Sequence, residues 1–331
     1  MRNMRLCANR KQPGAGLRAL IFLGGATMAA CSPPTPKAPP AIFADATIRD
    51  MTIRDMASGQ ALAFAGLIDK LAEADALLLG EQHDNPDHHR MQARIARELA
   101  ARGRRLVVVF EMIDNGQQSL LDGFLAGRPR DAAALGDLLG WEQSGWPDWA
   151  QYRPIADAVL AQPNPPAKPI RPANLPIATA RDIARNGLTA KGLDAALAET
   201  LRQAAARDPA VLAAHGEAIR DSHCGMLPDS ALAPFALAQY ARDSVMADSI
   251  AAASRDAPGA LVLLIAGNGH ARHDVGVPLH LARLRPGLKV LSMGLLEGDA
   301  PPEAAPFDLV WLSAPIPRED PCAAFRSSAR Q

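Results

Sequence analysis

The sequence ALLLGEQHDNPDHHRMQ, residues 76–92, contains an apolar run, a polar turn and the start of a helix in direct succession. Residues 76–80 are apolar or glycine, which is typical of a strand buried on both faces of a parallel sheet. Asn85 is a favourable N-cap and Pro86 a favourable first helical residue, so we expect a helix to begin there. The stretch therefore predicts the strand–loop–helix unit of an α/β fold.

Four more apolar runs of strand length follow along the chain. They occupy residues 106–111, 170–175, 261–267 and 288–294, and helical patterns separate them. Pro169 and Pro172 would each remove a hydrogen-bond donor from the third strand, so we expect that strand to be irregular or at an edge. The pattern predicts a mostly parallel sheet in an α/β fold.

The residues between the third and fourth of these strands have little strand character. Three stretches there are rich in alanine and helical in pattern, at residues 191–207, 209–222 and 230–255. We expect them to form a helical subdomain, residues 181–255, inserted into a core of residues 46–180 and 256–314.

The two ends of the core carry weaker patterns. The tandem copy TIRDMTIRDM at residues 47–56 is best explained as a short duplication at a tolerant edge. Residues 61–74 predict a helix, and we expect residues 315–331 to be a loose tail.

The first thirty residues have the pattern of a secretion signal. They carry basic residues and no acid, and the apolar stretch 19–30 is too short to span a bilayer. It ends in Met28-Ala29-Ala30-Cys31, which resembles a bacterial lipoprotein cleavage box. We expect a signal peptide over residues 1–30 and lipidation of Cys31, with plain secretion after cleavage near Ala30 as the alternative.

A proline-rich segment, residues 31–45, follows the signal and predicts an extended tether. Ser32 directly after the lipid cysteine leads us, by analogy, to expect an anchor in the outer membrane of the cell envelope. Without the five bases of the signal, 35 − 5 = 30 basic residues face 35 acidic ones, a net charge of −5. That balance argues against a nucleic-acid partner, which would call for a basic surface.

Histidines and glutamates follow the carboxyl ends of the expected strands, where α/β sheets bind their ligands. Glu81 and Glu111 end the first two strands, and six of the eight histidines fall in two groups: His83, His88 and His89, then His270, His273 and His280. Imidazole and carboxylate groups together can bind a metal, move protons or hold the charged groups of a ligand. The alternative is a polar network that only caps the sheet. Two histidine-bearing loops and two glutamates at one edge favour a functional site.

The chain contains four longer motifs: GEQHDNPDHHRMQ at residues 80–92, FEM at 110–112, WAQYRP at 149–154 and GNGHARHDVGVP at 267–278. Together these motifs resemble those of ChaN-type lipoproteins. ChaN-type proteins are grouped with Tiki proteins and erythromycin esterases in a superfamily marked by paired Gly-x-x-His motifs. The pair in this chain is Gly80…His83 and Gly267…His270, and the resemblance extends over residues 62–298.

The resemblance implies a three-layer α/β core with a small helical subdomain, and a surface lipoprotein that binds haem and serves iron uptake. Members hold haem on a tyrosine, with a histidine of a second subunit near the propionates, in a cofacial haem dimer. Phenolate is an established ligand of haem iron. A homodimer is therefore one partner that the resemblance allows.

The chain has two tyrosines that could ligate haem iron, Tyr152 and Tyr240. Tyr152 lies in a tryptophan-rich turn, where a packing role is commoner. Tyr240 points away from Val245 and Met246, the clearest apolar pair of its helix, so we expect Tyr240 to be the exposed ligand. An interfacial tyrosine without a ligand is the alternative. The other residues that we expect at the haem site are Glu81, His83, His88, His89, Glu111, His270 and His273.

A second candidate site lies between two of the helices expected in the insertion. His223, Cys224 and Met226 offer imidazole, thiolate and thioether, which suit a soft ion such as Cu(I) or a haem iron. Composition alone favours a loop with a buried cysteine and a gap-filling methionine. Cys224 could also pair with Cys322 in an oxidising compartment, although the composition of the tail makes that disulfide unpersuasive.

Two functions fit these patterns. The first is a membrane-anchored haem-binding lipoprotein for haem or iron uptake, with haem held near the carboxyl edge of the sheet and the helical insertion. The second is a metal-dependent hydrolase in which Glu81 or Glu111 is the general base, and His83 and His270 bind a divalent ion or transfer protons. The residues alone leave the two nearly level, and the resemblance places the haem carrier first. A carrier predicts an open apolar shelf with polar groups at its rim, whereas a hydrolase predicts a narrow cleft.

Overall fold

The computed structural model describes residues 53–127, 129–300, 303–320 and 322–323. The chain divides into two units, residues 1–47 and residues 48–331, and the description below is of the second. The expected signal peptide, the lipid site at Cys31 and the proline-rich tether lie outside the described residues. None of the helices in the described ranges has the length and apolar character needed to cross a bilayer.

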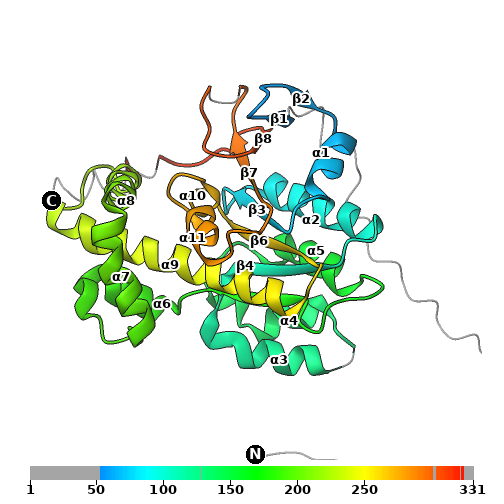
Figure 1. The fold of residues 1–331 in the computed structure, drawn as a ribbon, viewed down its shortest axis with the longest axis horizontal. Coiled ribbons are helices and arrows are strands. Elements are labelled where there is room, and N and C mark those ends of the chain that lie inside the picture. The colour runs from blue at the N-terminus through cyan, green and yellow to red at the C-terminus, as the bar shows by residue number, and fades with distance from the viewer. Residues whose placement is uncertain (1–52, 128, 301–302, 321, 324–331) are drawn as a thin grey trace, which may run out of the picture. The chain divides into compact units, whose positions relative to one another are not determined.

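An eight-stranded sheet forms the centre of the described fold, in the order β2-β1-β8-β7-β3-β6-β4-β5 (Figure 1). Its six strands from β8 to β5 are parallel, and β1 pairs antiparallel with β8 and β2. The strands are β1 (Ile53–Asp55), β2 (Ala61–Leu62), β3 (Ala76–Glu81), β4 (Leu106–Asp114), β5 (Ile170–Asn174), β6 (Leu261–Gly267), β7 (Val290–Glu297) and β8 (Leu309–Ser313).

Helices cover both faces of this sheet (Figure 1). They are α1 (Phe64–Leu71), α2 (Pro86–Ala101), α3 (Gln118–Ala126), α4 (Ala132–Leu138), α5 (Trp149–Leu160), α6 (Ile177–Asn186), α7 (Ala195–Arg207), α8 (Pro209–Ser222), α9 (Asp229–Asp256), α10 (Asn268–Ala271) and α11 (Val277–Leu284). α1, α2 and α5 pack on one face, and α11 and the second half of α9 pack on the other. The prediction of a three-layer α/β fold is confirmed.

Side chains of the central strands alternate between the two apolar cores. Leu77 and Leu79 of β3 point toward α1, α2 and α5, whereas Ala76 and Leu78 point toward α9 and α11. Both faces are covered, so both sets of side chains have to be apolar. That double burial explains the continuous apolar run at the start of residues 76–92.

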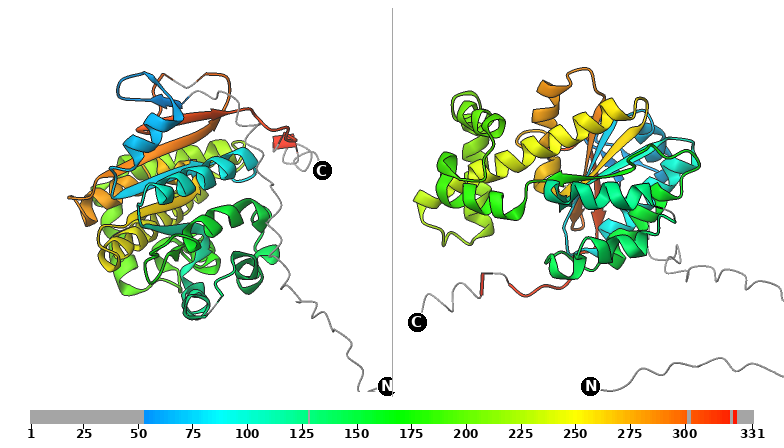
Figure 2. Two further views of the ribbon diagram at one scale, coloured as in Figure 1. Left: turned by 90° about the vertical axis from the view of Figure 1, so that its right-hand side faces the viewer. Right: turned by 90° about the horizontal axis from the view of Figure 1, so that it is seen from below.

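α6, α7 and α8 form the helical insertion between β5 and β6. Together with the first half of α9 they bury a third apolar core, which includes Ile183, Leu201 and Tyr240. α9 is 28 residues long and continues from this core onto the sheet (Figure 2, right, yellow). One helix therefore connects the insertion to the main fold.

The structure differs from the expected elements at the edges of the sheet. β5 lies at one edge, as the prolines predicted, but β1, β2 and β8 were not expected. β1 lies within the second TIRDM copy, and β2 occupies the start of the stretch expected as a helix, so α1 begins only at Phe64. The tail is also not loose as far as it is described, because Arg318 pairs with Asp84 and Glu297.

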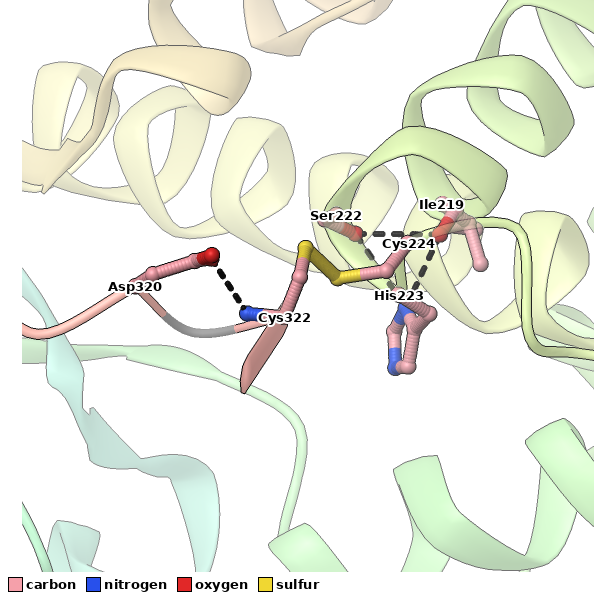
Figure 3. Close-up of a disulfide and its surroundings, with 6 residues drawn as sticks. All are labelled: Ile219, Ser222, His223, Cys224, Asp320 and Cys322. Atoms are coloured by element: carbon pink, nitrogen blue, oxygen red, sulfur yellow. Dashed lines mark hydrogen bonds between the residues drawn. A yellow bond between two sulfur atoms is a disulfide. The ribbon is translucent and has the colours of Figure 1, made fainter. Parts of the chain in front are cut away.

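Cys224 and Cys322 form a disulfide, with their Cα atoms 5.7 Å apart (Figure 3). The bond joins the α8–α9 turn to the C-terminal segment beyond β8. The composition of the tail makes this pairing unpersuasive, and that expectation is wrong. The tail is brought to Cys224 by packing that the local sequence does not encode.

The disulfide closes a loop between residues 98 positions apart, which restricts the unfolded chain. We expect the double variant Cys224→Ser/Cys322→Ser to lower the free energy of unfolding by about 3 kcal/mol in urea titrations. A reducing agent should lower the stability of the parent protein by the same amount and leave the double variant unchanged. Equal stabilities of parent and variant would contradict a structural role of the bond.

Candidate functional site

The two Gly-x-x-His loops leave adjacent strands at the same edge of the sheet. β3 and β6 are parallel neighbours, and Glu81 pairs in register with Gly267. His83 follows β3 and His270 follows β6, so both histidines lie beyond the carboxyl ends of their strands. The expectation that Glu81, His83, Glu111 and His270 come together is met, as the following distances show.

Each glycine of the paired motifs makes room for a residue of the other motif. A Cβ on Gly80 would lie 2.4 Å from Oδ1 of Asn268, and a Cβ on Gly267 would lie 3.0 Å from Nε2 of His83. Asn268 cannot easily move, because its amide binds Leu295 of β7, with Nδ2 donating to the carbonyl oxygen at 2.7 Å and Oδ1 accepting from the backbone nitrogen at 3.1 Å. The glycines are therefore required by the close approach of the two loops.

Glu81 is buried and surrounded by four polar side chains. Tyr152 donates to Oε1 at 2.7 Å, and Nδ1 of His83 lies 2.8 Å from the same oxygen. Gln92 donates to Oε2 at 2.8 Å, and Nδ1 of His89 lies 3.3 Å from it. Burial alone would raise the pKa of Glu81, but the contacts with His83 and His89 outweigh it and lower the pKa to about 2. Glu81 is therefore an ionised, fully engaged carboxylate.

Glu111 is the second buried carboxylate of the edge. Its Oε2 accepts from the backbone nitrogen of Gly267 at 2.7 Å and lies 3.8 Å from Nε2 of His83. Its Oε1 pairs with Arg242 and lies 3.4 Å from Nε2 of His270. Burial would raise the pKa of Glu111, but the charges of His270 and Arg242 hold it well below its usual value. The two glutamates are thus connected through His83.

His270 lies between two carboxylates, and it is buried. Its Nδ1 is 2.5 Å from Oδ1 of Asp243, and its Nε2 faces Glu111. Burial would lower the pKa of His270, but the charges of Glu111 and Asp243 raise it to about 9, so this imidazole is positively charged at neutral pH. The other oxygen of Asp243 lies 3.5 Å from Nε2 of the buried His215. Imidazoles and carboxylates therefore alternate from His215 to Glu81.

His83 is the group through which the cluster reaches the surface. Its side chain is 34% exposed, whereas the side chains of Glu81, Glu111 and His270 are at most 4% exposed. The ring of His83 packs against Trp146 with the ring centroids 4.9 Å apart. Burial lowers the pKa of His83, but the hydrogen bond to Glu81 and the charge of Glu111 outweigh it and raise the pKa.

A pocket of about 570 Å³ adjoins this cluster, and Glu111 and Trp146 line both. Its apolar wall comes from the ends of β4 and β5, the turn before α5 and the start of α6; it contains Met112, Leu139, Trp146, Leu175, Ile177 and Ala180. Arg181 of α6 and Arg242 of α9 contribute positive charge. Its volume is within the range of about 300–1,000 Å³ that is common for small-molecule sites.

Three histidines expected near the site have other roles. His88 is buried with Nδ1 accepting from the backbone nitrogen of Gln82 at 2.8 Å and Nε2 3.0 Å from Oγ of Ser313. His89 is buried behind Glu81, where it can orient the carboxylate but not touch a ligand. His273 lies 2.9 Å from Ser292 and 3.1 Å from Asp308, near the start of β8 and away from the carboxyl edge.

Tyr240 does not reach the surface, and its expected role as an exposed haem ligand is wrong. The side chain is fully buried, its hydroxyl donates to Asp208 at 2.6 Å and accepts from Arg207 at 3.1 Å, and its ring packs on His280. The inference from Val245 and Met246 failed because α9 packs against different cores along its length. The buried face of α9 therefore changes between its two halves.

The expected metal site in the insertion is also wrong. The sulfur of Cys224 is bonded to Cys322, and Nδ1 of His223 lies 2.8 Å from the carbonyl oxygen of Ile219 (Figure 3). Met226 is 49% exposed. Within the described ranges, no group of three His, Cys, Asp or Glu side chains is placed to hold a metal ion. The metal cofactor suggested by the sequence therefore finds no support.

Several residues of the cluster were missed from the sequence. They are Gln92, Asn268, Arg242, Asp243 and His215, and the hydrogen bond of Tyr152 to Glu81 was not foreseen. Arg242 and Asp243 are adjacent charges in the alanine-rich α9, and Asp243 is fully buried. A buried charge requires partners, so this pair was the available signal.

Comparisons with known proteins bear on the family and the fold of this chain. The family model described as haem-binding uptake, Tiki superfamily, ChaN matches residues 67–281. A solved structure of ChaN of Campylobacter jejuni with cofacial haem is similar to this chain with a TM-score of 0.63 and 24% identity, over 80% of this chain and 96% of that one. An erythromycin esterase in an open conformation has a TM-score of 0.40 and 16% identity, over 84% and 86% of the two chains. No curated protein matched this sequence.

The glycine contacts predict that an added methyl group destabilises the fold at Gly80 but not at Gly269 of the second motif. Gly80→Ala would force its Cβ against Asn268, and we expect it to lower the free energy of unfolding by about 2 kcal/mol. Gly269→Ala is the control, since a Cβ there meets nothing within 4 Å, and we expect a change within about 0.5 kcal/mol. Chemical denaturation measures both, and equal effects would contradict the packing described here.

The charge of His270 predicts a loss of stability at alkaline pH. Its folded pKa of about 9 lies above the ordinary value of 6.5, so its stabilisation is complete below pH 6.5 and disappears as the pH rises through 9. The difference corresponds to about 3 kcal/mol. We expect the free energy of unfolding to fall between pH 6.5 and 9.5, and His270→Gln to flatten that dependence. If the free energy of unfolding depends on pH equally in the parent protein and in His270→Gln, this prediction is wrong.

Proposed function

Because this chain belongs to the haem-binding uptake family, ChaN, of the Tiki superfamily, we propose that it binds haem at the cell envelope and takes part in haem or iron uptake. The observation that carries the proposal is the 570 Å³ pocket, which combines an apolar wall with two arginines. It lies between the carboxyl edge of the sheet and α6 of the insertion.

The residues of this pocket fit a porphyrin in two respects. Trp146, Ile177 and Met112 offer apolar surface for the macrocycle, and Arg181 and Arg242 offer donors for its propionates. The bound group would supply the iron that an uptake protein carries. A tyrosine ligand for the iron is not found, because both tyrosines of the chain are buried and hydrogen-bonded to carboxylates.

The anchor is a proposal that rests on the sequence. Residues 28–31 and the proline-rich tether support lipidation of Cys31 and attachment to the outer membrane. The disulfide between Cys224 and Cys322 supports a location outside the reducing cytoplasm. The homodimer allowed by the resemblance stays a prediction.

A hydrolase is the second candidate function, favoured by the convergence of Glu81, His83, Glu111 and His270. His83 is oriented by Glu81 at 2.8 Å and is partly exposed, which is the arrangement of a proton-transferring histidine held by a carboxylate. Glu81 and Glu111 themselves are poor bases, since the pKa of each is lowered. Turnover of ester substrates that disappears in His83→Ala would support this candidate over the carrier.

The pocket makes a specific prediction for haem binding. We expect the protein without its signal and anchor, residues 32–331, to shift the Soret band of haemin on titration. Ile177→Glu should weaken binding by about tenfold or more, because a carboxylate would replace an apolar contact and repel the propionates. Ile177 is 61% exposed, so the substitution should not harm the fold.

Leu284→Glu is the matched control for that experiment. Leu284 is 44% exposed on α11 and does not line the pocket. The affinity of the Leu284→Glu variant for haemin should equal that of the parent protein. A parent protein that leaves the haemin spectrum unchanged would remove the proposed function.

A further inference from the structure

Neither tyrosine of this chain can bind an iron in the pocket. Tyr152 and Tyr240 are fully buried, and their hydroxyls donate to Glu81 and Asp208. Burial and the neighbouring carboxylates raise the pKa of both phenols, which opposes the phenolate that would ligate iron. A second copy would not supply a tyrosine either, because each copy buries the same two side chains.

His83 packs on Trp146, which lines the pocket, but the nitrogens of His83 face carboxylates. Nδ1 is 2.8 Å from Glu81, and Nε2 points toward Glu111 at 3.8 Å and lies against the backbone of Gly267. Its raised pKa favours the imidazolium, which has no lone pair for a metal. Of the remaining soft donors, Met112 lines the pocket but belongs to the buried apolar core.

Two arginines of the pocket retain donors for an anion. Arg242 uses Nε on Asn174 at 3.1 Å, one Nη2 hydrogen on Glu111 and one Nη1 hydrogen in a long contact with Gln239 at 3.4 Å. A guanidinium has five N–H donors, so two remain uncommitted. The side chain is 24% exposed, and it lines the pocket.

Arg181 is exposed on α6 at the same pocket, and no ion pair of Arg181 is found in the described part of the chain. The carboxylates beside the two arginines are Glu111 and Asp114. Glu111 would keep Gly267 and His270 as partners if Arg242 bound an anion as well. Asp114 caps the following turn by accepting from the backbone nitrogen of Gly116 at 2.8 Å. Both acids are therefore already engaged.

We propose that this pocket recognises the carboxylate groups and the flat apolar body of its ligand rather than a metal at the centre. Its ligand class is then amphipathic planar dicarboxylates, with Arg181 and Arg242 pairing with the two carboxylates. Iron-free porphyrins belong to this class as fully as haem does. The inference rests on the proposed function in one respect, namely that a tetrapyrrole occupies this pocket.

The test compares ligands that differ in the metal or in the carboxylates. Binding of haemin, zinc protoporphyrin IX, metal-free protoporphyrin IX and its dimethyl ester to the full chain, with the disulfide intact, is measured by tryptophan quenching. We expect the three free acids to bind within about threefold of one another and the dimethyl ester to bind at least tenfold more weakly, because esterification removes the charges that the arginines pair with.

Arginine variants test the same idea from the side of the protein. Arg181→Gln should weaken the binding of haemin and of metal-free protoporphyrin equally, by about tenfold. Arg185→Gln, an exposed residue of the same helix outside the pocket, should change neither. Arg242→Lys keeps a positive charge beside Glu111 but removes the paired N–H donors of the guanidinium group, so it should weaken the binding of both ligands. Tyr240→Phe should leave the affinity and the spectrum of bound haemin unchanged.

The outcomes separate this inference from the proposed function. If haemin binds at least tenfold more tightly than the metal-free acid, the metal is recognised and the inference is wrong, while the proposed function stands. If the Soret band of bound haemin is lost in Tyr240→Phe, the inference is likewise wrong and the proposed function stands. If neither haemin nor any porphyrin binds, both are wrong.

Discussion

Two buried carboxylates, Glu81 and Glu111, impose the constraint on which the carboxyl edge depends. A buried charge without partners costs several kcal/mol, so each must be compensated. The partners come from the loop after β3, from α2, α5 and α9 and from the end of β6. Satisfying two charges thereby fixes the relative positions of elements from both faces of the sheet.

The sequence allowed this cluster to be predicted because a strand end is a local feature. Glu81, Glu111 and the two Gly-x-x-His loops each follow an apolar run, and parallel neighbours bring such ends together. The central strands were recognisable for the same reason, since double burial leaves long apolar runs. β1 and β2 have three and two residues, too few to show a pattern.

Features that depend on distant packing were not accessible from the sequence. The position of Tyr240 was predicted wrongly because α9 packs into two different apolar cores. A single helical periodicity therefore does not identify its buried face. The pairing of Cys224 with Cys322 depends on the path of the tail across the fold. Arg242 comes to Glu111 only because α9 crosses from the insertion to the sheet, so the insertion helps to build the site.

The C-terminal segment has a consequence for what happens after cleavage of the chain. Arg318 holds it to Asp84 and Glu297, and Cys322 is bonded to Cys224. A protease that cuts once anywhere between residues 224 and 322 leaves two fragments that remain covalently attached. Cleavage within α9 or in the loops before β7 and β8 therefore sheds neither piece, and the two fragments separate only after the disulfide is reduced.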